Sequence, residues 1–182
     1  MIRFFFILVL AAFAAVVMQH FIPPVSFLSG ARVMILPLIF FYGALALPFP
    51  GMLALAFVCG LMTDALAGQE VALGWSVILY ALMGALMSGF RPIFQEGRWE
   101  VHCLMSGVCT SLMTLITFLM ISVRRLGLYN ASMEFNADIW WRIGGAGLIA
   151  LVLAPAVFFV FKSLAAFVGY NPYNVIDDEE DY

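Results

Sequence analysis

The residue whose type and position most need a chemical explanation is Asp64, the only carboxylate among the first 69 residues. It lies in the stretch GLMTDALAGQEVALG, from Gly60 to Gly74, at the end of a long apolar run. A carboxylate in such surroundings either reaches water or is held by an arginine or by hydrogen-bond donors. A position near a helix C-terminus is also disfavoured by the helix dipole. Both interpretations, an interfacial and a buried carboxylate, stay open from the sequence.

Other residues with chemical potential form no recognisable set. Cys59, Cys103 and Cys109 lie inside apolar runs and make no CxxC pair, so neither a zinc site nor a disulfide framework is expected. His102 and Cys103 suggest metal ligation with Cys109, yet Cys103 and Cys109 are about 240° apart around a helix. No catalytic triad, phosphate loop or metalloprotease motif occurs. We therefore expect no catalytic residue, no metal and no cofactor.

The composition indicates a protein embedded in a membrane. Of 182 residues, 65% are hydrophobic and 10% are charged, and the mean hydropathy is +1.07, whereas soluble chains are roughly 45–50% apolar and about 25% charged. The net charge of −3 comes largely from an acidic tail at residues 177–181. No basic patch interleaved with aromatic residues suggests nucleic-acid binding. The predicted class is an all-α integral membrane protein.

Six transmembrane helices are expected in a domain of residues 1–169, followed by an acidic polar tail at 170–182. The expected spans are residues 4–21, 29–47, 49–68, 71–90, 102–123 and 143–168. The first apolar run is too long for the core of a signal peptide and ends at Pro23-Pro24. Pro48-Phe49-Pro50-Gly51 divides the uncharged run that follows into a hairpin. A re-entrant pair is the alternative for its two short arms, and Pro37 would kink the first of them.

The fourth expected span carries a face of small residues, which lets helix backbones approach closely in lipid. The residues of this helix-packing face are Ala81, Gly84, Ala85, Ser88 and Gly89. The face serves either packing inside the bundle or the binding of another protein. Six spans place both termini on one side of the membrane, but four arginine and lysine residues fall on each side, so charge bias leaves the orientation open.

The order Gly60-Leu61, Asp64, Gly68 and then Leu73-Gly74 before an apolar helix resembles the MreD family of bacterial rod-shape-determining proteins. Chain length, span number and the proline-broken hairpin before the motif agree with that family. Gly68 and Gly74 are two residues further apart than in the family pattern. The turn between them is therefore expected to differ in geometry from that of the family.

The resemblance implies a non-enzymatic subunit of the cell-elongation complex in the bacterial inner membrane, with both termini in the cytoplasm. Its implied partners are the single-span scaffold protein MreC and, through it, the filament protein MreB, the glycosyltransferase RodA and a class-B penicillin-binding protein. The family is also similar to the six-helix substrate-binding subunits of energy-coupling-factor transporters. A vitamin-binding transporter subunit is therefore the alternative function.

Within this framework Asp64 is expected to fix the turn between the third and fourth spans. Its carboxylate would accept charge-assisted hydrogen bonds from backbone NH groups of residues 67–70 or pair with an arginine at the same end of the bundle. Gly60, Gly68 and Gly74 would shape the turn. The result would be a rigid surface for the transmembrane helix of a partner.

Overall fold

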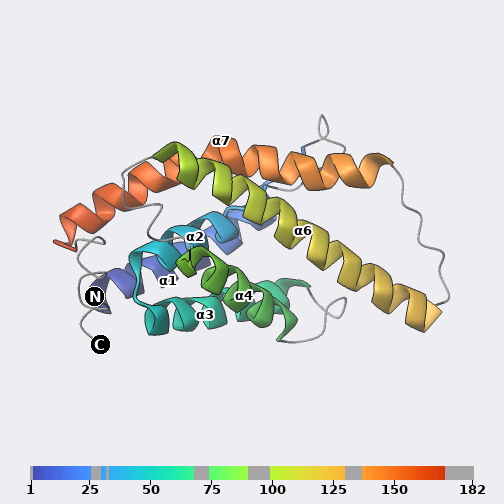
Figure 1. Ribbon diagram of the computed structural model, residues 1–182, viewed down its shortest axis with the longest axis horizontal. Coiled ribbons are helices and arrows are strands. Elements are labelled where there is room, and N and C mark those ends of the chain that lie inside the picture. Colours follow the sequence, from blue (N-terminus) through green and yellow to red (C-terminus); the bar gives the residue numbers. More distant parts are fainter. Residues whose placement is uncertain are drawn as a thin grey trace.

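The computed structural model of this protein describes residues 2–25, 30–31, 33–67, 74–89, 99–129 and 137–170, without the side chains at 20, 67, 99, 124–129 and 137. The described chain is helical apart from short connections and an isolated bridge between Val25 and Ala31. Its helices are α1 (Ile2–Phe21), α2 (Leu36–Ala46), α3 (Phe49–Ala67), α4 (Trp75–Gly89), α6 (Trp99–Tyr129) and α7 (Ala137–Phe167) (Figure 1). The predicted all-α class is confirmed.

The helices fall into two length classes. The long helices α1, α3, α6 and α7 are apolar and long enough to cross a membrane. Among the described helices, α2 has 11 residues and α4 has 15, which corresponds to about 16 and 22 Å at ~1.5 Å per residue. Both are shorter than the ~30 Å hydrocarbon core of a bilayer. By length, neither is therefore among the helices that could cross a membrane on their own.

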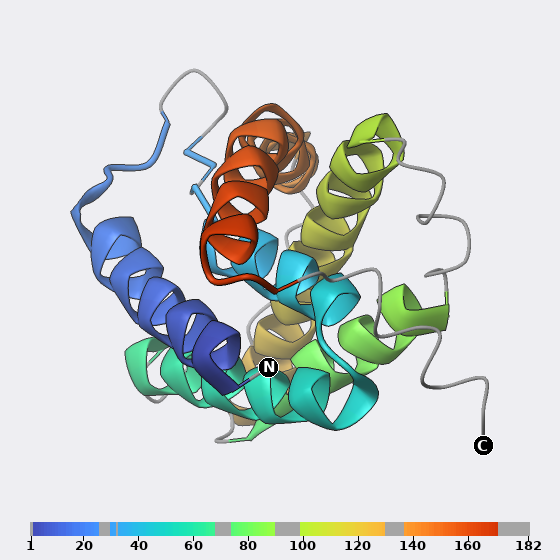
Figure 2. The same ribbon diagram turned by 90° about the vertical axis from the view of Figure 1, so that its left-hand side faces the viewer.

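Helix α2 occupies the centre of the bundle. It contacts each of the other five described helices, and Figure 2 shows it surrounded by them. Ten of its 11 residues are buried, as expected of a helix that is apolar on all sides. It begins at Leu36, later than the expected span of residues 29–47, because Pro37 lies in its first turn. Proline is favoured there, so Pro37 starts the helix and does not kink its interior.

Helices α6 and α7 extend beyond the apolar spans expected for them. Each has 31 residues, or about 46 Å at ~1.5 Å per residue, which is longer than a hydrocarbon core of ~30 Å. On α7, Arg142 and Lys162 are 20 residues apart, which matches a core of ~30 Å. Trp140 and Trp141 are exposed beside Arg142, in the position of interfacial anchors. The expected span ends at 68, 71 and 90 lie outside the described residues.

Both ends of α2 form hydrogen bonds with side chains from other parts of the chain. With the Gln19 amide turned so that its oxygen faces α2, that oxygen accepts from the NH groups of Ile35 and Leu36. At the other end, the Tyr170 hydroxyl donates to the Ala46 carbonyl over 2.6 Å. The first NH and last C=O groups of a helix have no intrahelical partner. Gln19 and Tyr170 thus provide the hydrogen-bond partners that water provides at the ends of exposed helices.

The position of Tyr170 is set by the end of α7. Gly169 has a φ of +70°, a left-handed conformation that glycine adopts without strain. The NH of Tyr170 bonds the Ala165 carbonyl and the NH of Gly169 bonds the Ala166 carbonyl, the pattern of a Schellman motif. The Tyr170 ring then stacks on Phe4, with centroids 4.7 Å apart. The start of α1 and the end of α7 therefore lie at the same end of the bundle.

Tyr170→Phe is expected to lower the free energy of unfolding by about 1 kcal/mol, since it removes one hydrogen bond and keeps the ring on Phe4. Thermal denaturation of the purified protein in detergent measures the change. Tyr170→Ala, which also removes the stacked ring, is expected to lower stability further. Equal stability of Tyr170→Phe and the unmodified protein would contradict a role for the hydroxyl at the end of α2.

Candidate functional site

The candidate site is the contact between the end of α3 and the start of α4. Gly60 and Asp64 are one helical turn apart and therefore lie on one face of α3. Both meet α4: Gly60 faces the backbone of Val77, and Asp64 faces the amides of Gly74 and Ser76. Asp64 is only 3% exposed. The structure thus places two of the predicted motif residues at one helix–helix contact.

The carboxylate of Asp64 caps the N-terminus of α4. The NH of Gly74 donates to Oδ2 over 2.6 Å, and the NH of Ser76 donates to Oδ1 over 3.2 Å. These amides belong to the turn that opens α4, where backbone NH groups lack intrahelical acceptors. The partial positive charge of this N-terminus favours an anion. The dipole of α3 disfavours a carboxylate near its C-terminus, but the dipole of α4 favours the same carboxylate at its N-terminus.

Gly60 allows the two helix backbones to touch. A Cβ at this position would lie 2.5 Å from the Val77 nitrogen and 2.8 Å from its Cγ2. Real Cβ atoms do not approach other atoms so closely, and a backbone nitrogen cannot turn away as a side chain can. Small residues permit such approach between membrane helices. The side chain at position 60 therefore sets how deeply α4 packs on α3.

Gly74 supplies the backbone conformation that brings the chain into α4. Its φ is +92°, a region that residues with a Cβ rarely adopt. The space around it is open, with nothing within 4 Å of a would-be Cβ. The requirement for glycine here is thus one of backbone dihedral angle. Because its NH also donates to Asp64, Gly74 joins the turn and the cap.

Some predicted members of the site cannot be placed. Gly68 and Leu73 lie outside the described residues, as do the expected amide donors at 68–70. The donors that the structure shows are those of Gly74 and Ser76. The sequence also allowed an arginine near a helix end as the partner of Asp64, and the side chains of three such arginines lie outside the described residues: Arg32, Arg124 and Arg125. Arg142 is described and lies beside Gly30, at the start of α7.

The predicted small-residue face of α4 divides into two parts. Gly84 is buried, and a Cβ there would meet Met52 and Phe40; this glycine serves packing inside the bundle. Ala81 and Ser88 are partly buried. Ala85 and Gly89 are exposed, and nothing lies within 4 Å of a Cβ at Gly89. Part of the face therefore points away from the described bundle.

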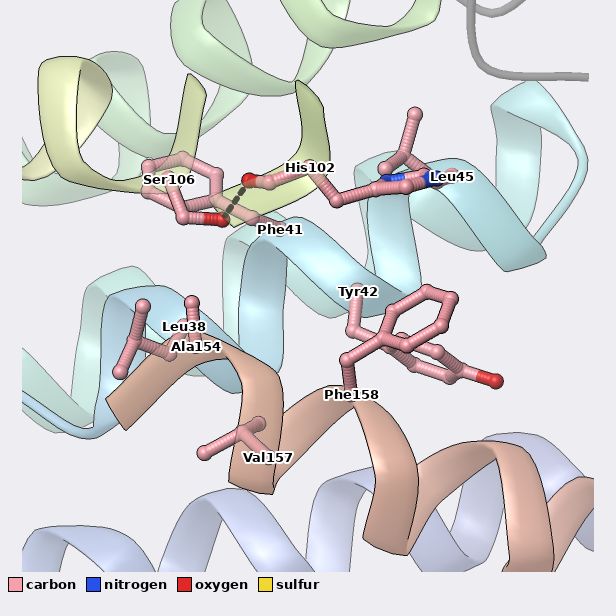
Figure 3. A pocket seen from close by; sticks show the side chains of 9 residues that line it. All are labelled: Leu38, Phe41, Tyr42, Leu45, His102, Ser106, Ala154, Val157 and Phe158. Carbon is pink, nitrogen blue, oxygen red and sulfur yellow. Dashed lines mark hydrogen bonds between the residues drawn. The ribbon is translucent and has the colours of Figure 1, made fainter. Parts of the chain in front are cut away.

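A second polar spot lies between α2, α6 and α7. Ser106 donates to the His102 carbonyl over 2.7 Å, and the His102 ring lies against Phe158, with centroids 4.9 Å apart. These residues border a cavity of about 20 Å³ together with Ala154, Val157 and residues of α2 (Figure 3). A volume of at least about 10–15 Å³ holds one water molecule. The cavity therefore has room for a single water.

The cysteines lie in the core. Cys59 and Cys109 are at most 1% exposed and Cys103 is 6% exposed. The Cys109 thiol donates to the Met87 sulfur over 3.8 Å, a contact that joins α6 to α4. Among the described side chains, no three of His, Cys, Asp or Glu are grouped in a way that would hold a metal ion.

Several residues of the site were missed by reasoning from the sequence. Ser76 and Val77 act through their backbones, so their side chains give no signal. A serine two residues after Gly74, at the start of an apolar run, is a weak sign of a helix N-terminus.

Comparison of the chain with protein-family models, with curated proteins and with solved structures gives no match.

What the site does chemically follows from its hydrogen bonds. Each carboxylate oxygen of Asp64 accepts from a backbone amide, and the carboxylate is buried. A carboxylate used in this way fastens one helix to the next. Together with the backbone contact at Gly60, it makes α3 and α4 a rigid hairpin with the exposed residues of α4 on its outer side.

Gly60→Ala is expected to lower the free energy of unfolding by about 1–3 kcal/mol, the usual range for an overpacked contact. Gly144→Ala is the matched control, because Gly144 lies in α7 with nothing within 4 Å of a would-be Cβ. Replacing an exposed glycine inside a helix with alanine raises the free energy of unfolding by about 1 kcal/mol, so Gly144→Ala is expected to stabilise the protein. Thermal denaturation in detergent compares the two, and equal effects of both substitutions would contradict the packing of Val77 on Gly60.

Asp64→Ala is expected to destabilise the protein by about 1–3 kcal/mol, because the amides of Gly74 and Ser76 lose their acceptors. Asp138→Ala is the control: Asp138 is an exposed acid in the first turn of α7, and its removal forfeits only a helix-dipole interaction of about 0.3–1 kcal/mol. Hydrogen exchange should also accelerate at the start of α4 in Asp64→Ala alone. Unchanged exchange there would show that Asp64 is not the cap of α4.

Proposed function

We propose that this chain is a non-enzymatic membrane subunit of the bacterial cell-elongation complex, of the MreD type. The observation that carries the proposal is the meeting of Gly60, Asp64 and Gly74 at one helix–helix contact. These are residues on which the resemblance to that family rests. A motif whose members fasten two helices suits a protein that acts through the shape of its membrane domain.

In this proposal the chain crosses the inner membrane six times, with α2 as a short crossing at the centre of the bundle and α4 as a short crossing packed on α3 at its outside. The stacking of Tyr170 on Phe4 supports an even number of crossings. Both chain ends then lie in the cytoplasm, as the family resemblance implies. The motif at Asp64 lies towards the periplasmic end.

The partner of the proposed subunit is the single transmembrane helix of the scaffold MreC, with RodA, a class-B penicillin-binding protein and MreB joined through the complex. The outer side of α4 supports this choice, because exposed Ala85 and Gly89 allow another helix to approach closely. The cap at Asp64 holds α4 in a fixed position on α3. Partner binding then depends on Asp64 although Asp64 itself is buried.

The alternative, a vitamin-binding transporter subunit, requires space for a small molecule. Pockets for such ligands have volumes of about 300–1,000 Å³. The cavity at His102 and Ser106, of about 20 Å³, is far smaller. The cavity at His102 and Ser106 is therefore not itself a site for a vitamin-sized ligand.

The test is a mild-detergent pull-down of the tagged protein from its native membrane, with mass spectrometry of the protein and small-molecule fractions. We expect a single-span scaffold and cell-wall synthases. Asp64→Asn is expected to reduce their recovery while the protein stays inserted, and Asp138→Asn, the same chemical change at an exposed site, is expected to leave recovery unchanged. Paired ATPases with a vitamin-like compound would overturn the proposal. Equal recovery of the partner proteins by both variants would show that partner binding does not depend on Asp64.

A further inference from the structure

A row of polar side chains runs along α6 inside the bundle. Its members follow one another at four-residue intervals: His102, Ser106, Thr110 and Thr114. Residues four positions apart are neighbours on the surface of a helix. The first three members are at most 9% exposed. Buried polar side chains are costly unless they are hydrogen-bonded, so the partners of this row decide what it can do.

The hydroxyl groups of the row donate to the backbone of α6 itself. Ser106 donates to the His102 carbonyl over 2.7 Å, and Thr110 donates to the Ser106 carbonyl over 2.7 Å. Thr114 donates to the Thr110 carbonyl over 2.8 Å. A hydroxyl group has one hydrogen to donate and two lone pairs with which to accept. With its hydrogen used in this way, the Ser106 hydroxyl offers an acceptor to its surroundings.

Two members of the row, His102 and Ser106, border the cavity between α2, α6 and α7 (Figure 3). The other side chains that line it are hydrocarbon apart from that of Tyr42. An imidazole has two ring nitrogens that form hydrogen bonds, so an imidazole and a hydroxyl acceptor lie at the same small space. A cavity of this size with polar groups in its wall suits a water molecule, whereas a purely apolar one stays dry.

The break in α7 adds a second reason for water at this place. Pro155 lies inside α7, and the residues that follow and precede it, Val157, Phe158 and Ala154, line the cavity. Because proline has no NH group, the carbonyl four residues earlier loses its usual helical donor. Ordered water molecules are among the groups that satisfy such carbonyls in membrane helices. The polar row of α6 and the proline of α7 thus occur at the same cavity.

We propose that this cavity is a binding site for one water molecule, which donates a hydrogen bond to the Ser106 hydroxyl oxygen and forms a second one with the His102 imidazole. The walls come from three helices, so the bound water lies where α6 and α7 pack on the central helix α2. The site brings an ionisable side chain into contact with water inside an apolar bundle. It does not depend on the proposed function, since it involves neither Asp64 nor the outer side of α4.

The water site is tested by hydroxyl-radical footprinting of the full chain in lipid nanodiscs, with X-ray pulses and mass spectrometry. The radicals form from water and oxidise the side chains beside them, so a buried ring is oxidised only next to a bound water. Phe41 lines the cavity and is 1% exposed, whereas its neighbour Phe40 is 0% exposed and does not line it. We expect several-fold more oxidation of Phe41 than of Phe40. Equally low oxidation of both rings would overturn the proposal.

A substitution at the cavity wall provides the second readout. Ala154→Val adds two methyl groups at the cavity and is expected to displace the water, so that oxidation of Phe41 falls to the level of Phe40. Ala156→Val, the same change at an exposed position of α7, is the matched control and should leave oxidation of Phe41 high. Oxidation of Phe41 that stays high in Ala154→Val would show that water reaches the ring by another route, and would overturn the site. The comparison of Phe41 with Phe40 in the unmodified protein holds even if Ala154→Val fails to fold.

Discussion

The constraint on which this structure depends is the need of buried helix ends for hydrogen-bond partners inside the protein. An unpaired NH or C=O group in hydrocarbon is costly by several kcal/mol. Among the described helices, the short helices α2 and α4 have ends that form hydrogen bonds with side chains from other parts of the bundle. Gln19 reaches the start of α2, Tyr170 its end, and Asp64 the start of α4. Each short helix is thereby tied to a neighbour at a fixed register.

The cap at Asp64 differs from the other two because it carries a charge. A charged acceptor makes shorter and stronger hydrogen bonds than a neutral one, and the 2.6 Å bond from Gly74 fits this expectation. Its effect depends on the close backbone contact at Gly60, one turn earlier, since the carboxylate reaches the amides of α4 only if α4 lies directly on α3. The glycine and the acid therefore act as one unit, which explains their spacing in the sequence.

The sequence was informative where a residue acts through its own type and failed where it acts through a distant partner. Proline and glycine marked the breaks around α2 and α3, and the buried acid marked the site. The partners of Asp64 are amides 10 and 12 residues further along the chain, a separation to which no helical periodicity applies. Tyr170 and Ala46 are 124 positions apart, and nothing in either residue type points to the other. The length of α2 was overestimated because apolar composition continues through residues 33–35, whereas Pro37 determines where the helix begins.

The same physics distributes rigidity unevenly over the bundle. Helices α3 and α4 are joined by a backbone contact and a charged cap, and α6 and α7 by a contact between two glycines. Between these pairs lies α2, which contacts the helices of both. A partner helix on the outer side of α4 would contact the pair that the Asp64 cap holds together, whereas one on α6 would contact the pair that the two glycines hold together. A partner on α4 alone would therefore act on the rest of the bundle only through α2, whereas a partner that covers both pairs would also fix their position relative to each other.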